Sequence, residues 1–417
     1  NPPFLVAAIR EQLAAGMELA PQSPLACEVA GLIHELTGVE RVAFSNTGTE
    51  AIMHAVRIAR ARTGRRKIAV FAGSYHGTFD GILAATDASG AHTFPGSTGT
   101  PQGMVDDVVV LTYGSEAALA RVRELAGELA AVLVEPVQSR QPALQPRAFL
   151  HALRALTRAH DIALIFDEMI TGFRIAPGGA QQWFDVRADL VAYGKAVGGG
   201  MPISVLAGDA AYMDLIDGGP WQFGDDSYPR AGMTTFGGTF CRHPLALAAC
   251  RAVLLHLRAE GPALQERTRR RSDALAAALG RAFDELGVPM RLANFGPLLR
   301  FESHGPYSMV LQPIELPLFY CLLNLHGVYT WERRVSFLST CHDDADLELV
   351  VRAARESIAE LLTHGFFAQG GARGPGQPGS RERSPPAGPP RPPRPAPPRP
   401  PPRPPPPPPP RPPPPPP

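Results

Sequence analysis

Between about residues 40 and 210, short apolar, β-rich runs alternate with longer stretches of helical periodicity. The runs are apolar throughout, as expected for strands that are covered by helices on both faces. The predicted strands are residues 67–72, 108–111, 131–134, 162–166, 190–193 and 204–207. Helical patterns lie between them at residues 49–62, 115–128 and 146–159. This alternation predicts an α/β fold with a mostly parallel sheet flanked by helices.

The chain follows other patterns before and after this region. Residues 1–40 read as a short helical segment. After Pro244 the predicted elements are a helical region to about residue 286, a strand at 298–302, a helix at 314–325, strands at 328–331 and 336–339, and an amphipathic helix at 345–363. We therefore predict an N-terminal segment, a large domain, a small α+β domain and a tail, with bounds 1–40, 41–260, 261–368 and 369–417.

The tail has a composition of its own. Residues 371–417 hold 27 of the 47 prolines and lack apolar side chains to bury, so we expect disorder or polyproline II there. The first 370 residues carry a net charge of about −6 and the tail about +7. An acidic body without a basic patch argues against nucleic acid as a partner. The chain contains no run of about 18 apolar residues, which argues against a membrane span.

Cysteine usage and the chain start bear on the cellular setting. The five cysteines include no C-x-x-C pair, which argues against a structural zinc and against a disulfide framework, and no metal is expected. A reducing, cytoplasmic location fits this pattern. Because the sequence starts at Asn1 and shows no targeting leader, we expect a piece of a longer protein.

Lysine is rare here, since Lys67 and Lys195 are the two lysines among 40 basic residues. Lys195 lies in YGKAVGGG, residues 193–200, between two predicted strands. An ammonium at the carboxyl end of a parallel strand points into the crevice where open α/β sheets bind ligands. Burial there would lower its pKa and give the amine that Schiff-base chemistry needs. A solvated surface lysine is the alternative, and we retain it for Lys67; the flanking glycines favour the catalytic interpretation of Lys195.

Two carboxylates, Asp167 and Glu168, follow the strand predicted at residues 162–166. A helix cap or a loop ion pair is the alternative role for a carboxylate at this position. Together with Lys195, however, a carboxylate there completes the pair that pyridoxal 5′-phosphate requires. The amine forms an imine, and the acid keeps the pyridine nitrogen protonated so that the ring can withdraw electrons.

The sequence also contains candidate residues for a phosphate site and for an aromatic ring that stacks on the cofactor. The segment SNTGTEA, residues 45–51, precedes a strong helical pattern, so free N–H groups and the positive helix end meet the hydroxyl of Thr49. An ordinary N-cap would look the same. Tyr75, in SYHG after the first predicted strand, can stack on a ring, and a core aromatic is its alternative.

These motifs, in this order, resemble the class III aminotransferases of fold type I, in particular the branch that contains glutamate-1-semialdehyde aminomutase. The matching segments are SNTGTEA (45–51), YHG (75–77), VEPV (134–137), FDEMITGFR (166–174), YGKAVGGGMP (193–202) and GGTFCRHPLALAA (237–249). The resemblance covers nearly all of residues 1–365. It implies the fold of pyridoxal-phosphate-dependent transferases, with a large and a small domain.

The resemblance also implies roles for individual residues. Lys195 would form the Schiff base and then carry the proton between the substrate and the cofactor, while Asp167 would pair with the pyridine nitrogen. Met169 would lie under the ring and Tyr75 above it. The implied phosphate ligands are Gly48, Thr49 and, from the partner subunit, Thr239. His76, Glu135 and Glu168 would support the site, and the shared phosphate ligand implies a homodimer.

The sequence departs from the family pattern at three places. Met169 replaces the β-branched residue that commonly follows the Asp-Glu pair, a change that should preserve an apolar floor. Arg242 and His243 replace the usual Gly-Asn before Pro244. The chain also starts where the family already has an N-terminal arm over the substrate site. Arg174 and Arg334 are candidate clamps for a substrate carboxylate, with a structural or surface role as the alternative.

The stretch WERRVSFLST, residues 331–340, resembles the aminotransferase domains of hybrid polyketide and nonribosomal peptide synthases. That resemblance implies transfer of an amino group from an amino-acid donor to the β-keto carbon of an acyl thioester on a carrier protein. A free-standing glutamate-1-semialdehyde 2,1-aminomutase or ω-aminotransferase is the nearest alternative. A catalytically silent interaction domain of the same fold is a further alternative, which the intact Lys195, Asp167 and Thr49 disfavour.

Overall fold

Seven strands form the central sheet of the computed structural model, which describes residues 2–17, 23–87, 90, 92–222, 224–303, 314–331 and 335–367. In sheet order they are β1 (Arg41–Ser45), β9 (Ser204–Gly208), β8 (Leu190–Tyr193), β7 (Ala163–Glu168), β6 (Leu129–Val134), β2 (Lys67–Phe71) and β5 (Val108–Leu111). The strands from β8 to β5 run parallel to one another. β9 pairs antiparallel with β8, and β1 pairs antiparallel with β9. The mostly parallel α/β sheet predicted from the sequence is confirmed.

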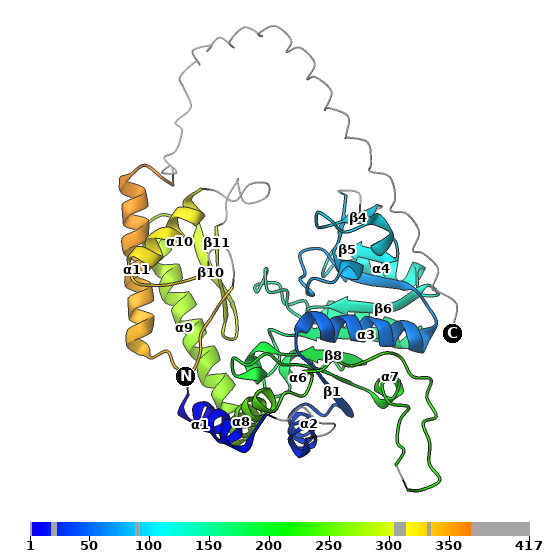
Figure 1. Cartoon of the computed structure of the whole chain (residues 1–417). Helices are drawn as coiled ribbons and strands as arrows, with labels where there is room; N and C mark the ends of the chain where they lie inside the picture. The colour runs from blue at the N-terminus through cyan, green and yellow to red at the C-terminus, as the bar shows by residue number, and fades with distance from the viewer. Residues whose placement is uncertain are drawn as a thin grey trace, which may run out of the picture. The chain divides into compact units, whose positions relative to one another are not determined.

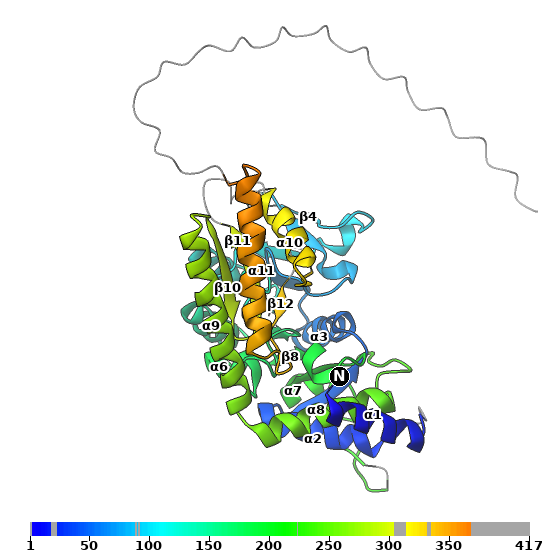
Figure 2. The ribbon, with the colours of Figure 1, turned by 90° about the vertical axis from the view of Figure 1, so that its left-hand side faces the viewer.

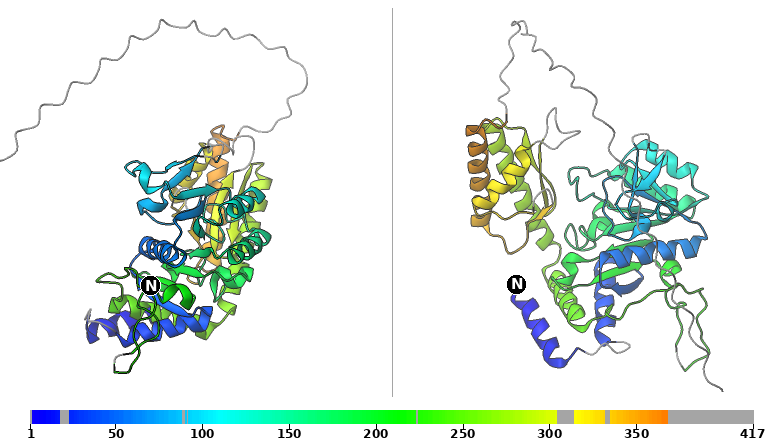
Figure 3. Two further views of the ribbon diagram at one scale, coloured as in Figure 1. Left: turned by 90° about the vertical axis from the view of Figure 1, so that its right-hand side faces the viewer. Right: turned by 45° about the horizontal axis from the view of Figure 1, so that its top comes forward.

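Helices cover both faces of this sheet because alternate residues of each strand point to opposite sides. In β6, Ala131 and Leu133 pack with α3 (Gly48–Thr63), while Val132 and Val134 belong to the other apolar core. That second core includes residues of α2 (Pro24–Thr37), α4 (Glu116–Glu124), α5 (Arg147–Ala159) and α8 (Pro244–Glu260). Figure 3 (left) shows the sheet between α3, in blue, and the teal helices on the other side.

The helix α9 (Ala263–Glu285) leads from α8 to a second, three-stranded antiparallel sheet. Its strands are β10 (Met290–Phe295), β11 (Leu298–Ser303) and β12 (Ser336–Phe337). α9, α10 (Glu315–Leu325) and α11 (Asp344–Thr363) pack on this sheet around Phe283, Phe301 and Phe319 (Figures 1 and 2). The α+β character predicted for this region is therefore present.

Several shorter elements complete the described chain. α1 (Pro3–Ala15) packs on α8, and a hairpin of β3 (Ala84–Thr86) and β4 (Thr93–Pro95) lies beside β5. The remaining helices are α6 (Gly179–Phe184), α7 (Ala210–Met213) and three 3₁₀ turns at Asp80–Ile82, Gln102–Met104 and Lys195–Gly198. The described residues all belong to one compact unit. The division of this unit at residues 40 and 260 stays a prediction, and the tail lies outside the described residues.

Some element predictions are wrong. The strand predicted at residues 328–331 has no strand partner in the described chain, and its Tyr329 and Trp331 side chains are exposed. The helical region predicted over 244–286 is confirmed, and it consists of two helices, because Gly261 takes a positive φ of 61° and Pro262 follows it. The strands β1 and β10 were not predicted. None of the described helices is long and apolar enough to cross a membrane.

Candidate active site

A cavity of about 270 Å³ opens where the parallel strands end and α3 begins. This is the edge at which open α/β sheets bind ligands. Seven residues predicted from the sequence line it: Gly48, Thr49, Tyr75, His76, Asp167, Met169 and Lys195. The other lining residues are Asn46, Gly77, Met201, Pro202 and Ile203. Four of these lie inside the motifs quoted above: Asn46, Gly77, Met201 and Pro202. Their position next to the predicted site residues could therefore have identified them from the sequence.

Lys195 begins the 3₁₀ turn that follows β8. Its φ of 50° is in the left-handed region, which is uncommon for a residue with a side chain and is found where a local fold is strongly constrained. The residue is open to solvent through the cavity, yet the surrounding protein displaces enough water to lower the pKa of its ammonium. The negative charge of Asp167 opposes this lowering, and the positive charge of Arg174 adds to it.

Asp167 lies on the next strand, β7, and is buried against His76. Its Oδ2 is 2.9 Å from His76 Nδ1, and its Oδ1 accepts a hydrogen bond of 3.1 Å from the Met169 N–H. Because a carboxylate only accepts, Nδ1 must carry the proton of this bond. The Nε2 atom of His76 is buried and has no hydrogen-bond partner among the described residues. The carboxylate is thereby fixed in one orientation at the cavity.

Glu135 supports this pair from outside the cavity. Its two oxygens accept hydrogen bonds from the N–H groups of Tyr75 and Ser139, at 3.0 and 3.3 Å. Burial raises the pKa of this carboxyl, while the nearby His76 lowers it. The contacts tie the segment that carries Tyr75 and His76 to the end of β6, so Glu135 holds the loop and does not touch the cavity.

The first turn of α3 supplies hydrogen-bond donors. The Thr47 side chain accepts from the Glu50 N–H at 3.2 Å, and the Glu50 carboxylate accepts from the N–H groups of Asn46 and Thr47. This capping box leaves the N–H groups of Gly48 and Thr49 without an acceptor among the described residues. They line the cavity at the positive end of the helix, which suits an anion such as phosphate.

The hydroxyl of Thr49 is also oriented for this purpose. Its Oγ1 accepts a hydrogen bond of 3.2 Å from the Thr78 N–H, which leaves the hydroxyl proton free to be donated. Gly77 lies so close that a Cβ there would be 2.4 Å from Oγ1, and its φ is 97°. Any side chain at residue 77 would therefore displace Thr49.

Met169 forms the apolar part of the cavity between two glycines. A Cβ on Gly48 would lie 2.9 Å from its sulfur atom, and a Cβ on Gly194 would lie 2.5 Å from it. Met169 is buried and lines the cavity, so an apolar floor is present in spite of the departure from the β-branched residue. Tyr75 lines the same cavity with half of its surface exposed.

The remaining predicted residues lie outside the cavity. Glu168 is fully buried and accepts hydrogen bonds from Thr171 and from the backbone at the start of α6. Thr239 is exposed, on the segment next to Asn46. Arg174 stacks on Phe337, with its guanidinium carbon 4.5 Å from the ring centre, and donates to the carbonyl of Ile170.

The other sequence departures can also be placed. His243 caps α8, because its Nδ1 accepts the N–H of Leu245 at 3.3 Å, and Arg242 is exposed beside it. The candidate clamp Arg334 lies outside the described residues. The cavity therefore brings together an amine, an ionisable carboxylate, free N–H donors and an apolar floor. This donor set fits pyridoxal phosphate, which needs each of these four groups.

Comparison with known proteins gives a consistent result. Residues 1–330 match the family model "Aminotransferase class-III". A glutamate-1-semialdehyde 2,1-aminomutase of Methanothermobacter thermautotrophicus is 35% identical over 373 residues, covering 86% of this chain and 84% of that protein. An ω-transaminase from Sphaerobacter thermophilus is 31% identical with a TM-score of 0.78, covering 86% of this chain and 83% of its own. A β-phenylalanine aminotransferase from Variovorax paradoxus is 31% identical with a TM-score of 0.74, covering 87% and 80%.

The family match spans most of the chain, and the relatives are matched over more than four fifths of this chain's length. Class III aminotransferases use pyridoxal phosphate, the cofactor that the cavity fits. The chain therefore belongs to the class III aminotransferases, and it is a pyridoxal-phosphate-dependent enzyme of the aminotransferase and aminomutase type.

Proposed function

We propose that the enzyme transfers an amino group from an amino-acid donor to the β-keto carbon of an acyl thioester held by a carrier protein. The observation that carries this proposal is the cavity lining, in which Lys195 is the one lysine or arginine among the described lining residues. A thioester acceptor brings no carboxylate for a second cation to bind, in contrast to a free keto acid; the carboxylate of the amino-acid donor is common to both kinds of acceptor and does not separate them. Similarity to a β-phenylalanine aminotransferase supports chemistry at a β carbon.

The residues of the cavity take the following roles in this proposal. Bound pyridoxal phosphate supplies the electron-withdrawing ring that stabilises negative charge on the substrate carbon. Lys195 would hold the cofactor covalently and would carry the proton at the substrate carbon, because its lowered pKa makes the neutral amine available. Asp167, fixed by His76, would keep the pyridine nitrogen protonated. Gly48 and Thr49 would hold the phosphate, and Met169 and Tyr75 would contact the ring from the cavity lining.

We further propose that the enzyme works as a homodimer in which Thr239 of one protomer binds the phosphate in the site of its partner. In the single chain Thr239 is exposed and does not line the cavity, although its segment borders Asn46. An exposed hydroxyl next to the phosphate end of the site is placed to act on a second copy.

A glutamate-1-semialdehyde aminomutase or a small-molecule ω-aminotransferase is the second candidate, favoured by the 35% identical aminomutase. The experiment that separates the candidates offers the holoenzyme and an amino donor either a β-ketoacyl carrier protein or glutamate 1-semialdehyde. Mass spectrometry follows each product. The proposal expects replacement of the keto oxygen by an amine on the carrier-bound chain. Conversion of the semialdehyde alone would assign the second candidate, and no conversion of either would favour a silent domain.

A further inference from the structure

A cleft of about 320 Å³, separate from the cofactor cavity, lies between the start of α9 and the loop after β12. Its lining consists of arginines and hydroxyl residues: Arg267, Thr268, Arg270, Arg271, Ser339 and Thr340. Residues three and four apart share one face of a helix, which is why the three arginines face the same side. Neither a carboxylate nor an apolar side chain is among these lining residues.

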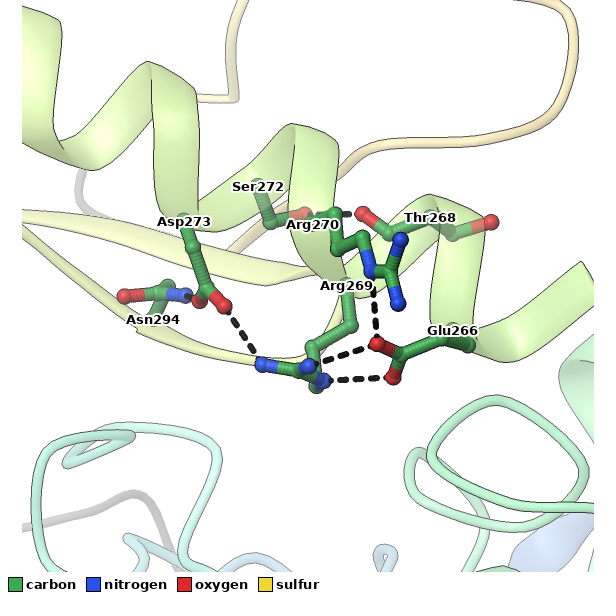
Figure 4. Close-up of polar contacts among 7 residues, drawn as sticks. All are labelled: Glu266, Thr268, Arg269, Arg270, Ser272, Asp273 and Asn294. Atoms are coloured by element: carbon green, nitrogen blue, oxygen red, sulfur yellow. Dashed lines mark hydrogen bonds and ion pairs between the residues drawn. The ribbon is translucent and has the colours of Figure 1, made fainter. Parts of the chain in front are cut away.

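Neighbouring groups hold each of these arginines at the cleft. Arg267 donates to Glu260 at 2.7 Å. Arg270 donates to Glu266 at 2.7 Å, as Figure 4 shows. Arg271 donates to the carbonyl of His342 at 2.8 Å and lies 3.2 Å from Asp344. Each arginine thus has one carboxylate that balances its formal charge, but these contacts engage one or two of the five N–H donors of each guanidinium. The remaining guanidinium donors have no acceptor among the residues that the structure describes, so they are available to bind an anion.

The opposite wall of the cleft is fixed by the same contacts. The imidazole Nδ1 of His342 accepts the N–H of Ser339 at 3.0 Å, and Arg271 holds the carbonyl of His342. These contacts hold the loop that carries Ser339 and Thr340 against the start of α9, and both residues line the cleft with the arginines. Two of the hydroxyls at the cleft already have acceptors, since Thr268 donates to the carbonyl of Leu264 at 2.9 Å and the Ser339 hydroxyl lies 3.0 Å from His342 Nδ1. The spare guanidinium N–H groups and the Thr340 hydroxyl are therefore the donors that the cleft offers, and guanidinium groups are the usual protein ligands of a phosphate group.

The cleft is connected to the active site through residues 173 and 174. Gln265, two residues before Arg267, donates to the carbonyl of Phe173 at 3.1 Å. Phe337, two residues before Ser339, carries the guanidinium of Arg174 on its ring. Residues 173 and 174 follow the segment of Asp167 and Met169. Both walls of the cleft are thus anchored to the strand end that forms the cofactor cavity.

We propose that this cleft binds the phosphate group of the pantetheine arm through which a carrier protein presents its acyl chain. The inference rests on the proposed function, in which the carrier-bound substrate brings such an arm. The arm has its phosphate at one end and the reacting thioester at the other, so a phosphate site at the cleft would help to position the thioester at the cofactor cavity. Free phosphate is the other source of the same chemistry, and the test separates the two.

The test compares pantetheine with 4′-phosphopantetheine, which differ by the phosphate alone, as ligands of the holoenzyme in titration calorimetry. We expect phosphopantetheine to bind at least about tenfold more tightly, as one or two charge-assisted hydrogen bonds would give. The double variant Arg267→Gln, Arg270→Gln should remove that difference. Arg281→Gln, at an exposed position further along α9, is the matched control and should leave it unchanged.

Two results of this titration would overturn the proposal. Equal binding of pantetheine and phosphopantetheine by the unaltered holoenzyme would show that the cleft does not bind the phosphate. Inorganic phosphate binding as tightly as phosphopantetheine would show a general phosphate site and defeat the assignment to the arm. Because neither ligand is a substrate, these outcomes do not depend on the reaction that the enzyme catalyses.

A kinetic comparison then links the cleft to the proposed function. With β-ketoacyl thioesters of the same two ligands, we expect a KM about tenfold lower for the phosphorylated one and similar kcat values. In the double variant, the KM for the phosphorylated thioester should rise, while the KM for the other thioester should stay unchanged. An unchanged KM in the double variant would contradict a role of the cleft in catalysis. If the enzyme aminates neither thioester but converts glutamate semialdehyde, the proposed function fails, while the calorimetry still decides whether the cleft binds phosphate.

Discussion

His76 contacts Asp167 through a single hydrogen bond in a buried setting, which makes its contribution measurable. We expect His76→Leu to weaken pyridoxal phosphate binding by about tenfold to a hundredfold, since a hydrogen bond to a charged group contributes about 1.5–3 kcal/mol. His76→Asn should bind nearly as well as the unaltered protein, because its amide nitrogen lies near the place of Nδ1. Equilibrium dialysis of the apoprotein measures both constants. Equal losses in the two variants would show that His76 acts by packing alone.

Arg174 offers a second test at the residue scale. Burial is the main reason why the pKa of Lys195 is lowered, and the charge of Arg174 adds to the effect. Removing that charge in Arg174→Gln should raise the pKa of Lys195, so that less neutral amine is present at pH 8. Acetylation of Lys195 in the apoprotein should therefore slow down, with Lys67, paired to Glu128, as the internal reference in mass spectrometry. An unchanged ratio of the two rates would contradict this coupling.

The residues of the cofactor cavity could largely be predicted because each belongs to a short contiguous motif. Lys195 follows a strand and Asp167 ends one, and both lie at the cavity as expected. The roles of Glu135 and Glu168 could not be predicted from a contiguous motif. Their partners are backbone N–H groups at the start of α6 or in the loop near Tyr75, and such contacts depend on how elements far apart in the chain come together.

At the scale of elements, Glu168 joins β7 to α6. It accepts hydrogen bonds of 2.9, 2.6 and 3.0 Å from the Thr171 hydroxyl and the N–H groups of Ala180 and Gln181. Glu168→Gln places an amide donor among these donors. We expect the free energy of unfolding at pH 8 to fall by about 2–3 kcal/mol, the value of roughly one hydrogen bond to a charged group. Urea denaturation checks this, and an unchanged midpoint would contradict it.

The same residue gives the stability a pH dependence. Burial outweighs the three hydrogen bonds and raises the pKa of Glu168 to about 7 from its ordinary 4.5. The folded state therefore binds this proton more tightly than the unfolded state. The contribution of the group to the free energy of unfolding should fall as the pH rises from about 4.5 to 7. Glu168→Gln, which cannot titrate, should lose less stability between pH 4.5 and 7 than the unaltered protein, and an equal loss would contradict the shift.

The accuracy of the predicted elements follows from burial. All six predicted strands of the central sheet are present, because strands covered on both faces are apolar throughout. The edge strand β1 is partly exposed and has a mixed sequence, and the strand predicted at residues 328–331 has β-prone side chains that are not buried. The break between α8 and α9 could have been predicted from the sequence, because glycine commonly ends a helix and proline commonly begins one, as Gly261 and Pro262 do here.

At the scale of the whole molecule, a site that is shared between two subunits predicts that two different impaired variants restore activity when they form a mixed dimer. If Thr239 acts in the partner's site, a mixed dimer of Lys195→Ala and Thr239→Val chains contains one site with both residues intact. Unfolding and refolding the two variants together should then restore part of the activity, whereas each variant alone stays impaired. No recovery in mixed dimers that are confirmed by mass spectrometry would place Thr239 in its own chain's site or outside any site.

The chain's two lysines allow one direct test of the account's central claim, that Lys195 is the residue that holds the cofactor. Borohydride reduction of the holoenzyme makes the link between the lysine and pyridoxal phosphate permanent, and peptide mass spectrometry then locates the added mass. We expect the cofactor on the peptide that contains Lys195, and its absence in Lys195→Ala but not in Lys67→Ala. Cofactor attached to Lys67, or no covalent attachment in the unaltered enzyme, would contradict the account.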